Sequence, residues 1–200
     1  MNAAFWNNRY ATTQYIFGEE PNAFLAEMAA HIPAGPVLCL AEGEGRNAVH
    51  LAALGHCVTA VDQSDAGLAK AQRLATMRSV KIETVVSDLE SFQIQPAAWA
   101  GIVAIFAHLP PTLRRKIHAA AVEGLRPGGV FILEAYTPAQ LMFATGGPKA
   151  PELLMNLVSL REELAGLNFL KAQEIERDVI EGDAHTGRAA VVQILASRDE

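Results

Sequence analysis

The chain has 200 residues, of which half are hydrophobic and 19% are charged, and its formal net charge is −6 at pH 7. This length and hydrophobic content predict a globular protein with one sizeable core and argue against a disordered chain. The acidic balance and the absence of any run rich in Lys or Arg argue against a nucleic-acid or membrane-surface binder. Because we find no long apolar span and no signal peptide, we expect a cytoplasmic protein.

The first 20 residues hold a dense group of aromatic side chains together with an arginine. The group consists of Phe5, Trp6, Arg9, Tyr10, Tyr15, Phe17 and Gly18. Such a cluster either covers one end of the core or folds over a bound ligand as a lid. Aromatic rings and an arginine suit a cationic ligand that carries a carboxylate, so we expect residues 1–20 to form a cofactor lid.

The stretch that organises the chain follows a predicted helix over residues 21–32. Its expected elements are a buried strand over 37–41, a tight turn at Gly43 and Gly45, a short helix over 47–54 and a strand over 57–61. Asp62 stands at the carboxyl end of the second strand. Such a turn presents backbone N–H groups and a helix N-terminus to a ligand, and a carboxylate at this place can accept hydrogen bonds from ribose hydroxyls. We therefore expect an adenosine-type cofactor; the simpler alternative is that the glycines only shape the turn.

The glycine turn does not choose between cofactors by itself. Residues 43–48 also fit the fingerprint of dinucleotide-binding proteins, which would indicate a nicotinamide cofactor. Glu42 and Glu44, however, place carboxylates in the loop where two phosphates would lie. A sulfonium cation with an amino-acid tail tolerates these carboxylates better, so the charge of the loop favours a sulfonium over a pyrophosphate.

Two more candidate residues follow the third and fourth predicted strands, over 80–86 and 102–106. Asp88 falls on the same sheet edge as Asp62, and we expect it to accept a hydrogen bond from an adenine amino group. The alternative for Asp88 is an ordinary loop acid or helix cap. His108 is a weak candidate for a general base; holding the loop or lining the cofactor are equally open roles for it.

The last third of the chain predicts an antiparallel end to the sheet. The expected elements are a helix over 111–124, a turn over 125–129, a strand over 130–135, a loop over 136–150, a helix over 151–166 and strands over 169–180 and 188–196. The connection between the last two strands is too short for a parallel crossover, so they form a hairpin. We expect the loop to cover the substrate side, His185 to be exposed in the hairpin turn, and Cys39 and Cys57 to be reduced thiols in buried strands.

These residues together resemble a class I S-adenosylmethionine-dependent methyltransferase over nearly the whole chain. The glycine turn, Asp62, Asp88 and the turn over 125–129 fall at that family's motif positions. Residues 5–10 with 17–22, and residues 41–47, are similar to small bacterial methyltransferases of the tellurite-resistance and thiopurine groups.

The chain also departs from the family pattern at the methionine end of the expected cofactor. The family often has an acid where this chain has Cys39 and a glycine where it has Ala41. Glu42 could supply the missing acid for the methionine amino group, from a shifted position.

The resemblance implies an α/β, Rossmann-like fold in a single domain over residues 1–200. Its seven-stranded sheet would be mostly parallel with an antiparallel last strand and helices on both faces. The expected function is methyl transfer from S-adenosyl-L-methionine to a small molecule, with a thiol or a chalcogen oxyanion among the candidates. We expect no metal, nucleic-acid or membrane partner, and the oligomeric state stays open. A nicotinamide-dependent oxidoreductase and a non-catalytic S-adenosylmethionine-binding protein are the alternatives.

The residue pattern and the resemblance together give one set of candidate cofactor-binding residues. They are Trp6, Arg9, Tyr15, Phe17, Gly18, Ala41, Glu42, Gly43, Arg46, Asp62, Gln63, Ser64, Ser87, Asp88, Leu89, Phe106, Ala107 and His108.

Overall fold

A computed structural model describes residues 2–143, 145–182 and 185–199. Within these residues, seven strands form one sheet in the order β3-β2-β1-β4-β5-β7-β6. The strands are β1 (Pro36–Leu40), β2 (Cys57–Asp62), β3 (Glu83–Val86), β4 (Trp99–Ile105), β5 (Leu125–Tyr136), β6 (Leu167–Glu181) and β7 (His185–Arg198). The first five strands are parallel to one another, whereas β7 pairs antiparallel with both β5 and β6. The predicted Rossmann-like fold with an antiparallel last strand is therefore confirmed.

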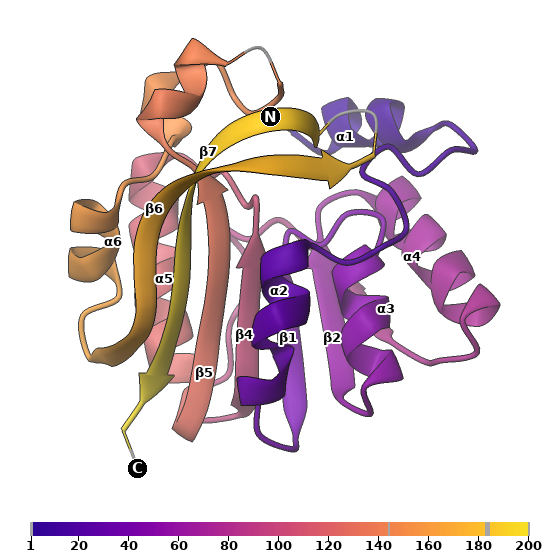
Figure 1. The fold of residues 1–200 in the computed structure, drawn as a ribbon. Helices are drawn as coiled ribbons and strands as arrows, with labels where there is room; N and C mark the ends of the chain where they lie inside the picture. Colours follow the sequence, from indigo (N-terminus) through magenta and orange to yellow (C-terminus); the bar gives the residue numbers. More distant parts are fainter. Residues whose placement is uncertain (1, 144, 183–184, 200) are drawn as a thin grey trace.

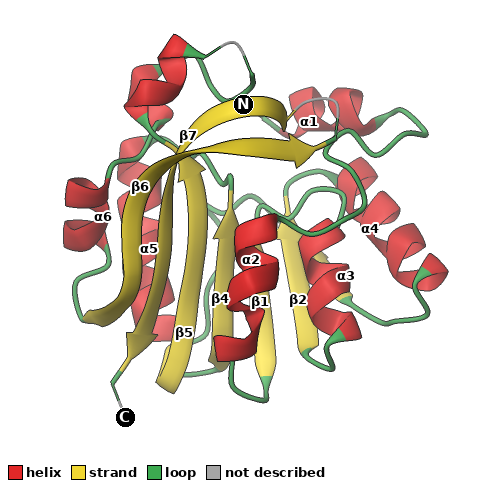
Figure 2. Ribbon diagram, viewed as in Figure 1, coloured by secondary structure: helices red, strands yellow, loops and turns green. Residues whose placement is uncertain are grey.

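Helices cover both faces of this sheet (Figure 2). They are α1 (Ala3–Tyr10), α2 (Ala23–Met28), α3 (Arg46–Ala53), α4 (Asp65–Met77), α5 (Pro111–Gly124) and α6 (Leu157–Glu163), with short 3-10 turns η1 (Ala29–His31), η2 (Pro138–Met142) and η3 (Pro151–Leu153). Alternate residues of each strand face opposite sides. In β1, Val37 and Cys39 pack with α2, α3 and α4, whereas Leu38 and Leu40 pack with α5 and α6. Burial on both faces explains why the parallel strands are almost continuously apolar.

The strands of the β6–β7 hairpin are the longest of the sheet, and the hairpin bends over the carboxyl edge of the sheet (Figure 1). Its tip lies against the N-terminal segment that connects α1 to α2. A Cβ atom on Gly182 would come within 2.4 Å of the backbone N of Gly18, so the two backbones are in close contact. The hairpin and the N-terminal segment thus meet above the ends of β1, β2 and β4 (Figure 1).

Four local expectations need correction or refinement. The N-terminal aromatic segment contains a helix, α1, that was not expected. The α-helix expected from Pro151 starts at Leu157, because residues 151–153 form a 3-10 turn. Cys57 is exposed at the start of β2, so only Cys39 is a buried thiol. His185 is packed among aromatic rings, as described below, and not exposed in a turn.

In the described part of the chain, no helix is long and apolar enough to cross a membrane.

Candidate functional site

The turn after β1 depends on two glycines with positive φ. Gly43 has φ 62° and Gly45 has φ 90°. A Cβ atom on Gly43 would lie 2.6 Å from the Tyr10 hydroxyl, and one on Gly45 would lie 2.4 Å from the Cβ of Ala71. Both positions therefore require glycine for conformation and for space. The turn is buried under Tyr10 of α1 and leads directly into the N-terminus of α3.

Asp62 lies where the sequence places it, at the carboxyl end of β2 beside this turn. Its Oδ2 accepts a hydrogen bond from the Gly43 N–H at 2.9 Å, and its Oδ1 accepts one from the Ser64 N–H at 2.8 Å. Burial raises the pKa of Asp62, although the backbone hydrogen bonds oppose that rise. The backbone N–H of Gln63 also donates a hydrogen bond to this carboxylate. An ionised carboxylate has about four acceptor sites, so Asp62 keeps capacity for a hydroxyl group beside these three bonds.

Glu42 and Glu44 have structural partners in this conformation. The Oε1 of Glu42 accepts hydrogen bonds from the backbone N–H groups of Asn47, at 3.0 Å, and Ala48, at 2.8 Å, and so caps α3. Burial raises the pKa of Glu42 to about 7. Glu44 forms a buried ion pair with Lys70 of α4. Its other oxygen accepts from the Phe17 N–H at 3.3 Å, which attaches the N-terminal segment to the glycine turn.

The N-terminal segment packs on the glycine turn and on α4. Tyr10 is buried, and its ring stacks on Trp6 with the centroids 5.5 Å apart. The Asn7 side chain contacts the Ser64 hydroxyl at 2.5 Å, and the Tyr15 hydroxyl donates to the backbone O of Lys70 at 3.0 Å. These contacts dock the segment on α4 next to Asp62.

The candidate residues after β3 lie next to Asp62 in the sheet. The Ser87 N–H donates to the backbone O of Asp62 at 2.9 Å, which joins the ends of β2 and β3. Asp88 is exposed, and its Oδ1 accepts from the Glu90 N–H at 2.8 Å. Leu89 is buried. Among the described residues, only Oδ1 of this exposed carboxylate accepts from the backbone, which leaves Oδ2 available for a contact to a ligand.

The carboxyl ends of β1 and β4 both contain a strained residue. Ala41 has φ 51° and Phe106 has φ 52°, values that L-residues other than glycine rarely adopt. Such strain costs on the order of 1 kcal/mol per residue and concentrates at functional sites. Ala41 stands where the resembling family often has glycine, so its backbone conformation matches the family although its side chain does not.

His108 is held at both ring nitrogens by the backbone. Its Nδ1 lies 2.9 Å from the carbonyl O of Leu153, and its Nε2 accepts a hydrogen bond from the Tyr136 N–H at 3.3 Å. Nδ1 must therefore carry the ring proton, which leaves Nε2 already engaged. Burial lowers the pKa of His108 to about 4. This geometry favours the loop-holding role over the general-base role.

Arg46 faces away from the glycine turn and into a buried polar network. Its guanidinium pairs with Glu181 of β6 at 2.5 Å. Glu181 and Glu134 of β5 both pair with Arg177 and both accept from the side-chain amide of Asn22, at 2.9 and 2.8 Å. The network connects the start of α3 to the end of the hairpin. Sequence reasoning missed it because its members are far apart in the chain; only the charges within strand-like segments signalled it.

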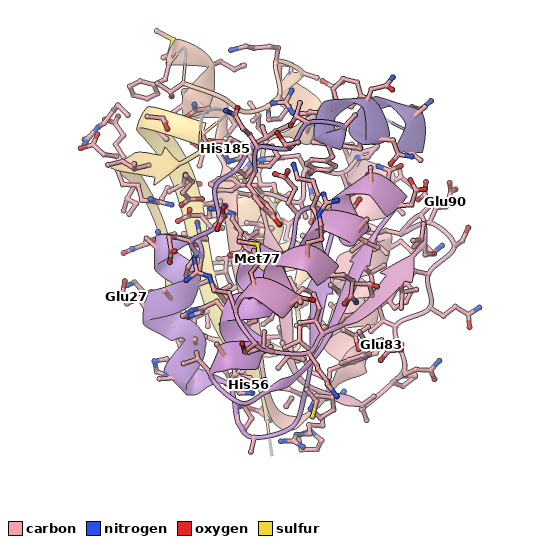
Figure 3. All side chains as sticks on the ribbon, turned by 90° about the vertical axis from the view of Figure 1, so that its right-hand side faces the viewer. Glu27, His56, Met77, Glu83, Glu90 and His185 are labelled. Atoms are coloured by element: carbon pink, nitrogen blue, oxygen red, sulfur yellow. The ribbon has the colours of Figure 1, made fainter. Side chains whose placement is uncertain are left out.

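Four aromatic rings meet where the hairpin tip crosses the ends of β4 and β5. The His185 ring lies 4.5 Å from Phe17, 4.7 Å from Phe106 and 5.4 Å from Tyr136, measured between centroids. Burial lowers the pKa of His185 to about 3, with further lowering from Arg46 and other cations. Figure 3 shows His185 at the end of the molecule where α1 lies, and His56, which precedes β2, at the opposite end. The cluster joins the N-terminal segment to the hairpin.

The loop over 136–150 also reaches this cluster. A Cβ atom on Gly147 would lie 2.8 Å from the Tyr136 ring, so the loop backbone packs directly on that ring. The Thr145 hydroxyl donates to the backbone O of Arg188 on β7 at 2.5 Å. Two hollows of about 760 and 520 Å³ lie elsewhere, between the N-terminal segment and α4, and Arg73 lines both. The chemistry described above lies at the strand ends and not in these hollows.

Comparison with known proteins shows what the chain is similar to. Residues 37–129, which contain the glycine turn, Asp62 and Asp88, match the model of the methyltransferase domain. This match covers slightly less than half of the 200 residues. No curated protein sequence matches the chain.

Solved structures share the fold of this chain at low sequence identity. A protein solved in work on the conversion of a disulfide bond into a thioacetal group during echinomycin biosynthesis is 21% identical, with a TM-score of 0.76 over 98% of this chain and 92% of that chain. TehB from Haemophilus influenzae is 21% identical, with a TM-score of 0.73 over 98% and 67%. The N-methyltransferase NodS from Bradyrhizobium japonicum is 14% identical, with a TM-score of 0.66 over 90% and 98%. At this identity the likeness concerns the fold alone.

S-adenosylmethionine is the methyl donor that the methyltransferase-domain match implies, and the described residues fit it. The turn at Gly43 has no side chain of its own and lies under Tyr10, and the Asp62 carboxylate beside it keeps acceptor capacity beyond its backbone hydrogen bonds. Burial raises the pKa of Tyr10, and the carboxylates of Asp62, Glu44 and Glu42 raise it further. The Tyr10 ring therefore lies near negatively charged groups, which suits a sulfonium cation and not a pyrophosphate.

Proposed function

We propose that this protein is a methyltransferase that binds S-adenosylmethionine across the carboxyl ends of β1, β2 and β3 and methylates a small molecule. The observation that carries the proposal is the position of Asp62. Its carboxylate is fixed by Gly43 and Ser64 beside a turn that has no side chains. A fixed, partly desolvated carboxylate is suited to a ribose hydroxyl, and charged acceptors make the stronger hydrogen bonds.

The other cofactor contacts follow from the arrangement of the strand ends. Asp88 and Ser87 would bind the adenine side, because they extend from the neighbouring strand. Phe106 and Ala107 would lie under the transferring group at the end of β4. The segment over 1–20 would close over the ligand, with Tyr10 already seated against the glycine turn. Arg46 would act indirectly, because its guanidinium is paired with Glu181.

The acceptor is proposed to be a thiol or a chalcogen oxyanion. Among the described candidates, His108 was the residue considered for a general base, and both of its ring nitrogens contact the backbone. A thiol is partly ionised near neutral pH and an oxyanion is already charged, so neither needs a strong base. The bound cofactor supplies an activated methyl group on a sulfonium. The chain orients the acceptor behind that group and excludes water.

Isothermal titration of the purified protein tests the cofactor assignment. We expect binding of S-adenosylmethionine and S-adenosylhomocysteine and no binding of NADH. The same titration with Glu83→Ala, an exposed carboxylate on β3, should give unchanged affinity. Binding of NADH without S-adenosylhomocysteine binding would contradict the proposal. A methyl-transfer screen that begins with thiols and chalcogen oxyanions then tests the acceptor class.

A further inference from the structure

Two buried polar atoms in the aromatic cluster have no hydrogen-bond partner among the described residues. They are the hydroxyl oxygen of Tyr136 and the Nδ1 of His185. Tyr136 is completely buried at the end of β5, and the two ring centroids lie 5.4 Å apart. Buried polar groups are nearly always hydrogen-bonded, so two unpaired ones in the same cluster require an explanation. A ligand that binds both atoms would supply it.

The position of the cluster connects it to the acceptor and not to the cofactor. Tyr136 and Phe106 end β5 and β4, and these strands pair next to each other in the sheet. Asp62 and the glycine turn belong to β2 and β1 on the other side of β4. Phe17 and His185 close the cluster from the N-terminal segment and the hairpin. The loop at Gly147 covers the Tyr136 ring.

The charges around the cluster are already paired. Arg46 pairs with Glu181, and Arg177 pairs with both Glu181 and Glu134. Arg9 is exposed and lies over the Phe17 ring, with its Cζ 5.6 Å from the centroid. Among the described residues, therefore, no buried cation near the two polar atoms is left unpaired.

The two polar atoms are themselves uncharged at neutral pH. Burial raises the pKa of the Tyr136 hydroxyl, and burial lowers the pKa of His185 to about 3. The hydroxyl can thus donate a hydrogen bond, and the neutral imidazole nitrogen can take part in one. Aromatic rings surround both atoms.

We propose, on the basis of the methyltransferase function proposed above, that Tyr136 and His185 form the acceptor-binding site and bind an uncharged molecule with a flat apolar body. The hydroxyl of Tyr136 donates to a hydrogen-bond acceptor of that molecule. The Nδ1 of His185 accepts from a neighbouring donor of the same molecule. The rings of Phe17 and Phe106 contact its apolar body. Of the two acceptor classes considered above, the site therefore disfavours the oxyanion.

A matched pair of probes tests this assignment. Benzamide is flat and uncharged and offers one carbonyl acceptor beside an N–H donor, whereas benzoate has nearly the same shape and a negative charge. Ligand-observed NMR titrations are made on the full chain saturated with S-adenosylhomocysteine, whose binding is first confirmed by calorimetry. We expect saturable millimolar binding of benzamide, at least about tenfold weaker binding of benzoate, and no competition by tellurite. A tenfold ratio corresponds to about 1.4 kcal/mol.

The variant Tyr136→Phe removes the unpaired hydroxyl and keeps the ring. Because this hydroxyl has no partner among the described residues of the free protein, the melting temperature should stay unchanged or rise. Affinity for benzamide should fall about fivefold, whereas affinity for S-adenosylhomocysteine should not change. His185→Phe should also lower the affinity for benzamide. Trp99→Phe is the control, since the Nε1 of Trp99 is another unpaired buried atom but lies at the amino end of β4.

Several outcomes would overturn the assignment. These are benzoate binding as tightly as benzamide, no benzamide binding to the wild-type complex, or full benzamide affinity in Tyr136→Phe. A melting temperature lowered by several degrees in Tyr136→Phe would show that the hydroxyl has a partner and would also contradict it. If wild-type protein does not bind S-adenosylhomocysteine, the failure lies with the proposed function and not with the acceptor site.

Discussion

The proposed cofactor side and the proposed acceptor side of this sheet are built differently. At the ends of β1 and β2, carboxylates bind backbone N–H groups a few residues away, as Asp62 does with Ser64 and Glu42 with Asn47. At the ends of β5 and β6, carboxylates bind side chains from distant segments, as Glu134 does with Asn22 and Arg177. Local backbone contacts fix the cofactor side, whereas long-range side-chain contacts fix the acceptor side. The two sides should respond differently to mutation.

The largest expected effect is on stability, from Glu134→Ala. Glu134 is completely buried and accepts from Asn22 at 2.8 Å and from Gln193 at 2.5 Å, besides its pair with Arg177. Its removal leaves buried donors unpaired, which should lower the free energy of unfolding by about 3–5 kcal/mol. Urea denaturation of the variant and the wild type measures this difference in the free energy of unfolding.

The control for this prediction is an exposed ion pair on the same hairpin. Arg188 and Glu176 lie 3.3 Å apart, with about half of each side chain exposed. Glu176→Ala should change stability by less than about 1 kcal/mol. Equal effects of the two substitutions would mean that the buried network does not hold the acceptor side together.

The second prediction concerns cofactor affinity. Asp62→Ala removes a hydrogen bond to a charged acceptor, which contributes roughly 1.5–3 kcal/mol. It also leaves the N–H groups of Gly43 and Ser64 unpaired and should lower stability, so affinity is measured on folded protein. We expect affinity for S-adenosylhomocysteine to fall at least about tenfold. Calorimetric titration of a variant whose circular dichroism matches the wild type provides the measurement. Unchanged affinity would remove Asp62 from the cofactor site.

The local and distant contacts also explain what the sequence could predict. Gly43 and Gly45 shape the turn in which they stand, and Ser64 caps the helix that it precedes, so these roles can be read from spacing. The antiparallel pairing of the last two strands follows from the short connection between them. His185 could not be placed in this way, because the bend of a long hairpin over the sheet decides its surroundings.

The same reason accounts for the other differences. Arg46 follows the glycine turn and was therefore assigned to the cofactor, yet Glu181, far along the chain, determines the direction of its side chain. The start of α6 at Leu157 was missed because Pro151 suits a first turn equally well in a 3-10 turn and in an α-helix. Cys57 begins β2 at the exposed edge, where an apolar strand pattern does not ensure burial.

The third prediction extends the comparison to pH. Glu163 of α6 pairs with Arg114 and His118 of α5. Burial raises the pKa of Glu163, but hydrogen bonds from His118 and Arg114 outweigh it and lower the pKa from 4.5 to about 2. A lowered folded-state pKa means that this group stabilises the protein fully above the unfolded pKa and loses its effect as pH falls through the folded pKa.

The difference in melting temperature between wild type and Glu163→Gln measures this contribution. The difference should be constant above pH 4.5 and should shrink as pH falls toward about 2. Cofactor affinity at neutral pH should not change, because the pair lies between α5 and α6. A difference in melting temperature that does not depend on pH would contradict the assignment of the lowered pKa to this group.

The smallest expected effect comes from the helix cap beside Asp62. The Ser64 hydroxyl accepts from the Gly67 N–H at 3.0 Å and caps α4. Ser64→Ala should lower the free energy of unfolding by about 1 kcal/mol. Asn156→Ala, which removes the cap of α6 on the acceptor side, is the matched control and should cost about the same. Thermal denaturation compares the two; a much larger loss for Ser64→Ala would show that its contact with Asn7 dominates.

Hydrogen exchange with and without S-adenosylhomocysteine tests the division of the sheet most directly. We expect the ligand to slow exchange in three segments, over 41–47, 62–64 and 87–89, and in the covering segment over 5–18. Exchange in β6 and β7 should change less, because their network is complete without the ligand. Slower exchange confined to the hairpin, with no change over 41–47 and 62–64, would contradict the placement of the cofactor.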